Sequence, residues 1–246
     1  MDQDQRSKAE NRSVLGIIRL DCDESTEESS SELIERNAVT PFSYESPAFW
    51  NVPFLNAIAR GADAVGNKIP TVAASRGIVE AANRLDGRTQ LIIGDCGYMW
   101  ASREHLYGRT STPTIMSALE FLDLALRMTS LPIGIITWDE KPLKPLLHAH
   151  PGFDRLRFLS VADLPEWAKW AEQPDNYMQP GGWTKERMAQ QFGERLSNAF
   201  AEAGSFSPIG LLILECTLVP DFRKTIRSLT PVPVLDLLNF AKTALE

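Results

Sequence analysis

The sequence predicts an α/β protein made of two similar halves, each built on a mostly parallel β-sheet. Short apolar runs alternate along the chain with segments of helical apolar spacing, as in α/β architecture with parallel strands. Two of these runs also recur later in the chain. Leu15–Asp21 (LGIIRLD) recurs as Ile133–Asp139 (IGIITWD), and Leu91–Gly97 (LIIGDCG) recurs as Leu211–Thr217 (LLILECT), at offsets of 118 and 120 residues. Because both pairs recur at nearly one spacing, we infer an internal repeat with equivalent strands in the two halves.

Apolar spacing and turn residues predict the individual elements in order. The proline-rich segment Pro41–Pro53 cannot form a continuous helix, because proline and the residue before it resist helical geometry. The predicted strands are Val14–Leu20, Thr89–Gly94, Pro132–Thr137, Gly210–Leu214 and Val232–Leu235. The predicted helices are Ile78–Leu85, Met116–Met128, Thr184–Ala203 and Asp221–Leu229, with a further helix at the C-terminus.

These elements define the expected domains. Residues 1–13 are polar and are expected to form a disordered arm. Residues 14–115 together with 226–246 form the first predicted α/β domain, and residues 116–225 form the second. In this division, the strand and helix after Val232 return to the first half and complete its sheet.

Composition and charge exclude several classes of function. The 32 acidic residues outnumber 25 basic ones, which argues against a nucleic-acid partner. No apolar run approaches the roughly 18–20 residues that cross a bilayer, so we expect no membrane partner. The first residues lack the apolar core of a signal peptide. Three cysteines, Cys22, Cys96 and Cys216, cannot form a disulfide framework, and we therefore expect a cytoplasmic protein with thiols available for chemistry.

Cys96 and Cys216 are the candidate catalytic residues. Each follows a predicted parallel strand and an acidic residue, and each precedes a segment that can open a helix. Ligands of open parallel sheets bind at the carboxyl ends of the strands. A helix N-terminus there lowers the pKa of a thiol and attracts carboxylates. If an approximate twofold axis relates the halves, the two thiols face each other across a cleft and can serve opposite faces of one carbon. The alternative is that each is an ordinary buried cysteine.

The segments GDCGY at Gly94–Tyr98 and LECTLVP at Leu214–Pro220, together with the strands GIIRLD and GIITWD, resemble the aspartate/glutamate racemase superfamily. The branch with hydantoin racemases and arylmalonate decarboxylases is the most similar. The resemblance implies two α/β domains with pseudo-twofold symmetry, an active-site cleft with paired cysteines, and cofactor-independent chemistry on a small carboxylate. We accordingly expect no metal, flavin, nicotinamide or pyridoxal phosphate, and leave a homo-oligomer open.

The sequence departs from this branch at three places. Asp95 stands where the branch usually has a small hydroxyl residue, and a nearby carboxylate would raise the pKa of the Cys96 thiol. Neighbouring side chains on a strand point to opposite faces, so Asp95 can also point away from Cys96. Glu215 raises the same question for Cys216, but the family tolerates it. Trp138–Leu143 is bulky where small residues are common, and the tryptophan-rich segment 166–183 forms either a lid or a cap over an apolar surface.

The predicted function is a cofactor-independent racemase or epimerase, an isomerase, acting on an amino acid or related carboxylate by two-cysteine proton transfer at the α-carbon. Two alternatives stay open: a decarboxylase or cis–trans isomerase of a small dicarboxylic acid, and a non-catalytic module that binds a small anion. Backbone N–H groups after each cysteine would hold the substrate carboxylate. The predicted substrate-binding residues are Gly97, Tyr98 and Thr217, with Arg19 for a second anionic group and, from the resemblance, Asn51 and Thr137.

Overall fold

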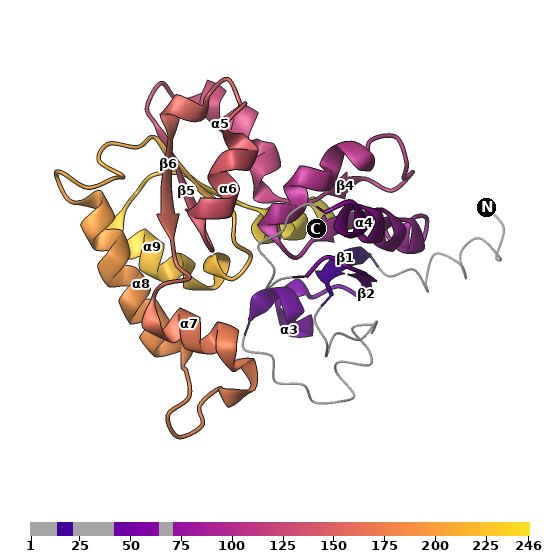
Figure 1. Cartoon of the computed structure of the whole chain (residues 1–246), viewed down its shortest axis with the longest axis horizontal. Coiled ribbons are helices and arrows are strands. Elements are labelled where there is room, and N and C mark those ends of the chain that lie inside the picture. The colour runs from indigo at the N-terminus through magenta and orange to yellow at the C-terminus, as the bar shows by residue number, and fades with distance from the viewer. Residues whose placement is uncertain (1–13, 22–41, 64–70) are drawn as a thin grey trace. The chain divides into compact units, whose positions relative to one another are not determined.

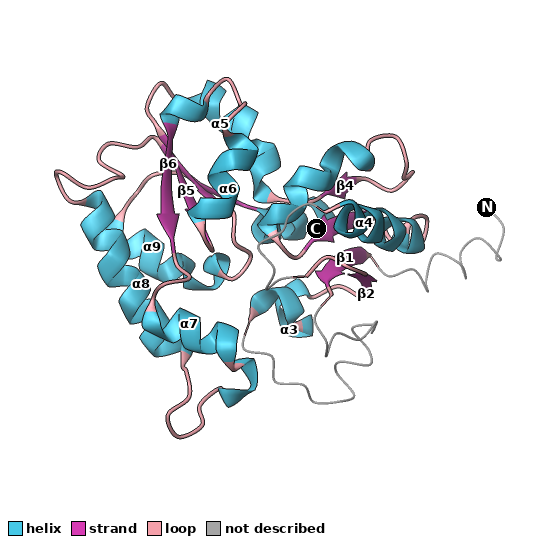
Figure 2. Ribbon diagram, in the orientation of Figure 1, coloured by secondary structure: helices cyan, strands magenta, loops and turns pink. Residues whose placement is uncertain are grey.

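The computed structural model describes residues 14–21, 42–63 and 71–246. The predicted arm at residues 1–13 and the third cysteine, Cys22, lie outside these residues. The described chain forms two four-stranded sheets, all of whose paired strands are parallel, with helices around them (Figure 2). The predicted α/β class is confirmed. No helix in the described ranges combines the length and the apolar character that crossing a bilayer requires.

The first unit comprises residues up to Glu120 and the C-terminal segment Leu237–Glu246. Its sheet has the strand order β2-β1-β3-β4. The strands are β1 (Leu15–Leu20), β2 (Phe54–Ala59), β3 (Leu91–Gly94) and β4 (Thr114–Ile115). The α-helices are α3 (Pro47–Trp50), α4 (Val72–Leu85) and α10 (Leu237–Leu245), and the 3-10 helices are η1 (Ser43–Glu45), η2 (Gly97–His105) and η3 (Ala118–Phe121), the last of which runs into the second unit.

The second unit comprises Phe121–Asp236, and its sheet has the order β6-β5-β7-β8. The strands are β5 (Ile133–Thr137), β6 (Leu156–Ser160), β7 (Leu211–Leu214) and β8 (Val234–Asp236). The α-helices are α5 (Leu122–Met128), α6 (Glu140–Leu147), α7 (Pro165–Glu172), α8 (Lys185–Phe200) and α9 (Arg223–Leu229), and the 3-10 helices are η4 (Phe153–Arg155), η5 (Pro174–Asn176) and η6 (Val219–Phe222).

The internal repeat is confirmed in strand order and in register. In the first sheet Leu15 pairs with Leu91, and in the second Ile133 pairs with Leu211. These four positions are those that the sequence offsets of 118 and 120 residues relate. The outer strands follow the same scheme, because β2 lies beside β1 as β6 lies beside β5. Each central strand of one sheet therefore has an equivalent in the other.

The C-terminal part of the chain differs from the predicted division. The expected last strand, β8, pairs with β7 in the second sheet, where Leu214 lies opposite Asp236. It does not complete the first sheet. The physical reason is local: β7, helix α9 and β8 form a short parallel crossover, which adds the new strand beside the one just left. Only α10 returns to the first unit, where it packs against β3.

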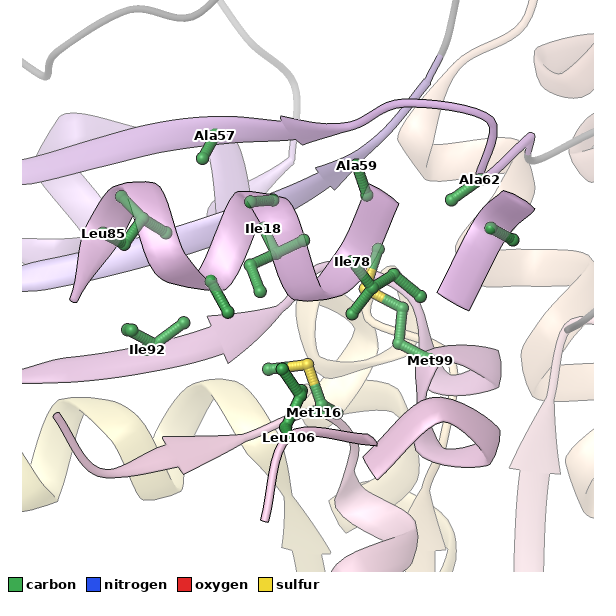
Figure 3. Packing of buried hydrophobic residues seen from close by; sticks show 13 residues of the cluster. Ile18, Ala57, Ala59, Ala62, Ile78, Leu85, Ile92, Met99, Leu106 and Met116 are labelled. Atoms are coloured by element: carbon green, nitrogen blue, oxygen red, sulfur yellow. The ribbon is translucent and has the colours of Figure 1, made fainter. Parts of the chain in front are cut away.

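Helix α4 covers the first sheet and organises its core. It packs against β2 and β1, and the three lie side by side in Figure 1. Figure 3 shows Ile78 and Leu85 on the face of α4 that points toward Ile18 of β1 and Ile92 of β3. The helix begins where the Thr71 side chain accepts a hydrogen bond from the Ala74 N–H at 3.0 Å.

The start of the tryptophan-rich segment, helix α7, packs into the core of the second unit. Trp167 is fully buried, and its ring centroid lies 5.0 Å from that of Phe222 and 6.0 Å from that of Phe192. The preceding Glu166 is also buried, and its carboxylate accepts hydrogen bonds at 2.8 Å from Lys169 Nζ and from Arg187 Nε. These contacts favour the cap over the lid for α7.

Replacing Gly77 of α4 by Ala is expected to lower the free energy of unfolding by about 1–3 kcal/mol, the usual cost of overpacking. A Cβ at this position would lie 1.9 Å from the Arg60 carbonyl oxygen, so the helix would have to move away from the backbone that follows β2. Urea titration followed by circular dichroism measures the effect. Glu80→Ala, on the exposed side of the same helix, is the matched control and should change stability little. Equal stability of Gly77→Ala and the parent would contradict this account.

Candidate active site

Cys96 lies directly beyond the carboxyl end of β3. Asp95 continues the sheet by one residue, since its N–H donates to the Ile18 carbonyl of β1 at 3.0 Å. Cys96 then has extended backbone angles and caps η2, where its carbonyl accepts from the Met99 N–H at 3.0 Å. The residue is half-buried, packs against the apolar cluster below α4, and carries a thiol.

Cys216 has the same backbone setting in the second unit. The Glu215 N–H donates to the Ile136 carbonyl of β5 at 2.8 Å, and the Cys216 carbonyl accepts from the Val219 N–H at 3.1 Å. Each donor and acceptor is the repeat equivalent of its counterpart around Cys96. The two thiols therefore emerge at equivalent points of their sheets, at the edge where parallel sheets bind ligands.

The acidic residues before the two cysteines face residues at equivalent positions of the repeat, but these residues differ in charge. The Asp95 carboxylate accepts from the Leu20 N–H at 3.2 Å and lies 3.7 Å from Nε of Arg19. The repeat relates Arg19 to Thr137 and Leu20 to Trp138. The Glu215 carboxyl correspondingly faces the Thr137 hydroxyl and the Trp138 N–H. The first acid thus has an arginine beside it, whereas the second has neutral donors.

Burial raises the pKa of the Glu215 carboxyl to about 7, although the Thr137 hydroxyl and the Trp138 N–H both lower it. Only 2% of the residue is exposed. Neither Glu215 Oε1 nor Thr137 Oγ1 forms a hydrogen bond of regular geometry with any described residue. At neutral pH this carboxyl is therefore partly protonated.

Burial also raises the pKa of the Cys216 thiol, to about 12, and the charge of Glu215 adds to this effect. The N–H groups of Leu218 and Val219, at the start of the helical turn, act in the opposite direction. The expectation that the helix start would leave Cys216 with a lowered pKa is wrong, because burial and the neighbouring carboxylate outweigh these donors. Cys216 is a thiol at neutral pH.

Five of the six other predicted site residues fall into two groups. Gly97, Tyr98 and Thr217 follow the cysteines directly, and all three are buried. Arg19 and Thr137 face the acids at the strand ends, as described above.

Asn51 lies apart from Cys96 within the first unit. It is exposed, with a left-handed backbone (φ 55°) at the end of α3. It precedes the amino end of β2, so the structure does not bring it to the carboxyl edge that carries Cys96.

Some residues at this edge were not singled out by the sequence. These are the donors to Cys216, Leu218 and Val219, and the neighbour of Asp95, Leu20. Trp138 was noted as a bulky residue but not as a donor to Glu215. Aligning the two copies of the repeat would have paired Leu20 with Trp138. Their role could not be predicted from residue type, because both act through the backbone N–H. Within the described ranges, no group of three or more His, Cys, Asp or Glu side chains is arranged to hold a metal ion.

Solved structures share this fold. The chain is 16% identical to allantoin racemase from Pseudomonas fluorescens, with a TM-score of 0.53 over 94% of this chain and 89% of that one. Allantoin racemase from Klebsiella pneumoniae gives 17% identity and 0.51 over 95% and 86%, and glutamate racemase RacE1 from Bacillus anthracis gives 16% and 0.51 over 96% and 80%. The two-domain α/β fold that the sequence resemblance implied is confirmed. Neither protein-family models nor curated proteins gave a match.

The raised pKa of Glu215 predicts how Glu215→Gln changes stability with pH. The unfolded chain ionises a glutamate near its ordinary pKa of 4.5, whereas the folded protein keeps this proton to about pH 7. Ionisation therefore favours the unfolded parent as the pH rises through this window, and Gln removes that penalty. Relative to the parent, Glu215→Gln should gain about 3 kcal/mol between roughly pH 5 and pH 8, as measured by urea unfolding.

Glu166→Gln is the matched control in the same unit. Burial raises the pKa of Glu166, but Lys169 and Arg187 outweigh it and hold the pKa below its ordinary value. This carboxylate is ionised in both states above about pH 5, so the stability difference between Glu166→Gln and the parent should stay nearly constant across the window. A constant difference for Glu215→Gln as well would contradict the assignment of a neutral buried carboxyl.

Proposed function

We propose that this protein is a cofactor-independent racemase or epimerase of an amino acid or a related carboxylate, in which Cys96 and Cys216 transfer protons at the α-carbon. The supporting observation is that the two thiols have equivalent backbone settings at the ends of equivalent strands. Inversion of one carbon requires a base on one face and an acid on the other. A duplicated thiol supplies one group for each face.

In the proposed reaction Cys96, as the thiolate, removes the α-proton, and the electrons of the C–H bond pass into the adjacent carbonyl or carboxylate. Cys216 then donates its proton to the opposite face of the same carbon. The high pKa of Cys216 supports its role as the resting proton donor. The Leu218 and Val219 N–H groups would stabilise the thiolate that donation leaves behind. Proton transfer by positioned groups of this kind contributes roughly 10²–10⁴-fold to the rate.

The proposed anion site consists of the backbone N–H groups of Gly97, Tyr98 and Thr217, with the Thr217 hydroxyl. Donors arranged in advance for a developing enolate are typically worth ~3–4 kcal/mol each. Arg19 is less suited to a second substrate anion than its sequence suggested, because it lies beside Asp95. Thr137 is fully buried and faces Glu215, so we assign it to that carboxyl.

One observation also fits the decarboxylase alternative. Decarboxylation of a malonate-type acid needs a single thiol that protonates the carbanion, and a thiol that stays protonated at neutral pH meets that requirement. The two reactions differ in what they require of Cys96, which the variants below test.

The first test of the proposal is proton exchange in D₂O. The protein is incubated with each enantiomer of allantoin, other hydantoins, glutamate, aspartate and further amino acids, and with arylmalonates, and deuteration and optical rotation are followed. Racemisation predicts deuterium at the α-carbon together with loss of optical rotation. Binding of an anion without exchange at any substrate of the panel would favour the binding module instead.

Substitution of each thiol then separates the mechanisms on the substrate so found. Cys96→Ala and Cys216→Ala should each abolish inversion. Cys216→Ala keeps Cys96 as a base and should still exchange the α-proton of one enantiomer, whereas Cys96→Ala keeps Cys216, which is protonated at neutral pH, and should exchange it far more slowly. Cys22→Ala is the control that removes the third thiol, and it should retain parent activity. Full inversion by either single variant would refute the two-base assignment, and turnover that depends on Cys216 alone would favour decarboxylation.

A further inference from the structure

The two strand-end acids are equivalent in position but differ in what balances their charge. Asp95 lies beside Arg19, so its negative charge has a partner at 3.7 Å. The equivalent of Arg19 in the second unit is Thr137, a neutral residue. Glu215 is therefore in the position equivalent to that of Asp95, but it has no arginine at the equivalent of Arg19. It is also less exposed to water than Asp95. Because the groups that act on Glu215 are neutral donors, the carboxyl is neutralised by keeping its own proton.

Charged groups from neighbouring elements at this end of the second sheet have other partners. Asp236, at the end of β8, accepts a hydrogen bond from Arg223 of α9. Asp139, after β5, caps α6 by accepting from the Lys141 N–H at 2.9 Å. Asp221 of η6 pairs with Lys185 at 3.0 Å. Cys216, next to Glu215 in the chain, is a further titratable neighbour, and the Glu215 charge opposes its ionisation.

We propose that Glu215 is a positioning residue that controls the ionisation of Cys216, so that a negative charge on the carboxyl keeps the adjacent thiol protonated. Glu215 and Cys216 are adjacent in the chain and both buried, so a negative charge on one opposes a negative charge on the other. Glu215 ionises first, and Cys216 then remains a proton donor through the alkaline range. The difference is visible in the sequence: both repeats have an acidic residue before the cysteine, but only the first repeat has an arginine, Arg19, at the position that faces the acid.

The effect of Glu215 on turnover rests on the proposed function. Its effect on the ionisation of Cys216 does not. Each catalytic cycle would pass through a Cys216 thiolate, whose formation costs more once Glu215 is ionised. Activity would therefore fall as Glu215 loses its proton, and Glu215→Gln would extend it to higher pH. The ionisation of Cys216 can be measured with no substrate, which separates a failure of this inference from a failure of the proposed function.

The test is carbon-13 NMR of cysteine labelled at Cβ, in full-length protein carrying Cys22→Ser and Cys96→Ser, so that Cys216 gives the only cysteine signal. The Cβ shift is followed from about pH 5 to pH 10. With Glu215 present, the signal should show a small step near pH 7, where Glu215 titrates, and little conversion to thiolate by the end of the range. With Glu215→Gln the step should vanish, and the thiolate fraction at a fixed alkaline pH should rise on the order of tenfold, equivalent to one pKa unit.

Two further variants control for structural damage. Thr137→Val keeps the carboxyl and removes the hydroxyl that lowers its pKa, so the step should move to higher pH. Glu166→Gln removes a buried carboxylate whose charge is balanced elsewhere in the unit and should leave the Cys216 titration unchanged. If Glu215→Gln does not fold, the inference is tested by whether the step in the Cys216 Cβ shift moves to higher pH in Thr137→Val. A Cys216 titration that is the same in the parent, Glu215→Gln and Thr137→Val would overturn the inference.

Discussion

The parallel ladder of each sheet runs one residue beyond the strand that leads to the cysteine. Asp95 donates to Ile18 and Glu215 donates to Ile136, and these two backbone hydrogen bonds fix where the chain leaves the sheet. Because Cys96 caps η2 and Cys216 opens the turn that leads into η6, the position of each thiol relative to its sheet is determined by the ladder. The side-chain partners of the acids and the donors around Cys216 depend on this exit point.

The same backbone geometry carries two different electrostatic environments. In the first unit the half-buried thiol follows an acid that lies beside an arginine. In the second, the thiol and its acid are both buried, and neutral donors face them. A duplicated fold thus places two groups of the same chemical type in different surroundings. Different surroundings are the means by which paired groups take opposite acid and base roles.

The sequence predicted the central strands because fully buried parallel strands are continuous apolar runs, such as Ile133–Thr137. It did not identify β2 and β6, which lie at sheet edges and include polar residues such as Asn56 and Arg157. The last strand was predicted at Val232–Leu235 and is observed at Val234–Asp236, but it was assigned to the wrong sheet, because so short a run carries no information about its neighbour. The cysteines could be identified from the repeat alone. The protonation of Cys216 could not, since it depends on burial and on which side chain faces Glu215.

The return of α10 to the first unit makes the second unit an insertion between two segments of the first. Leu238 and Ala241 of this helix are fully buried, and the helix packs against β3. Phe121–Asp236 is continuous in sequence, so on the ribosome every strand of the second sheet is available as soon as Asp236 has emerged. The core of the first unit must wait for residues made more than a hundred positions after its sheet. During synthesis, the half of the molecule that begins second is therefore the half that can be completed first.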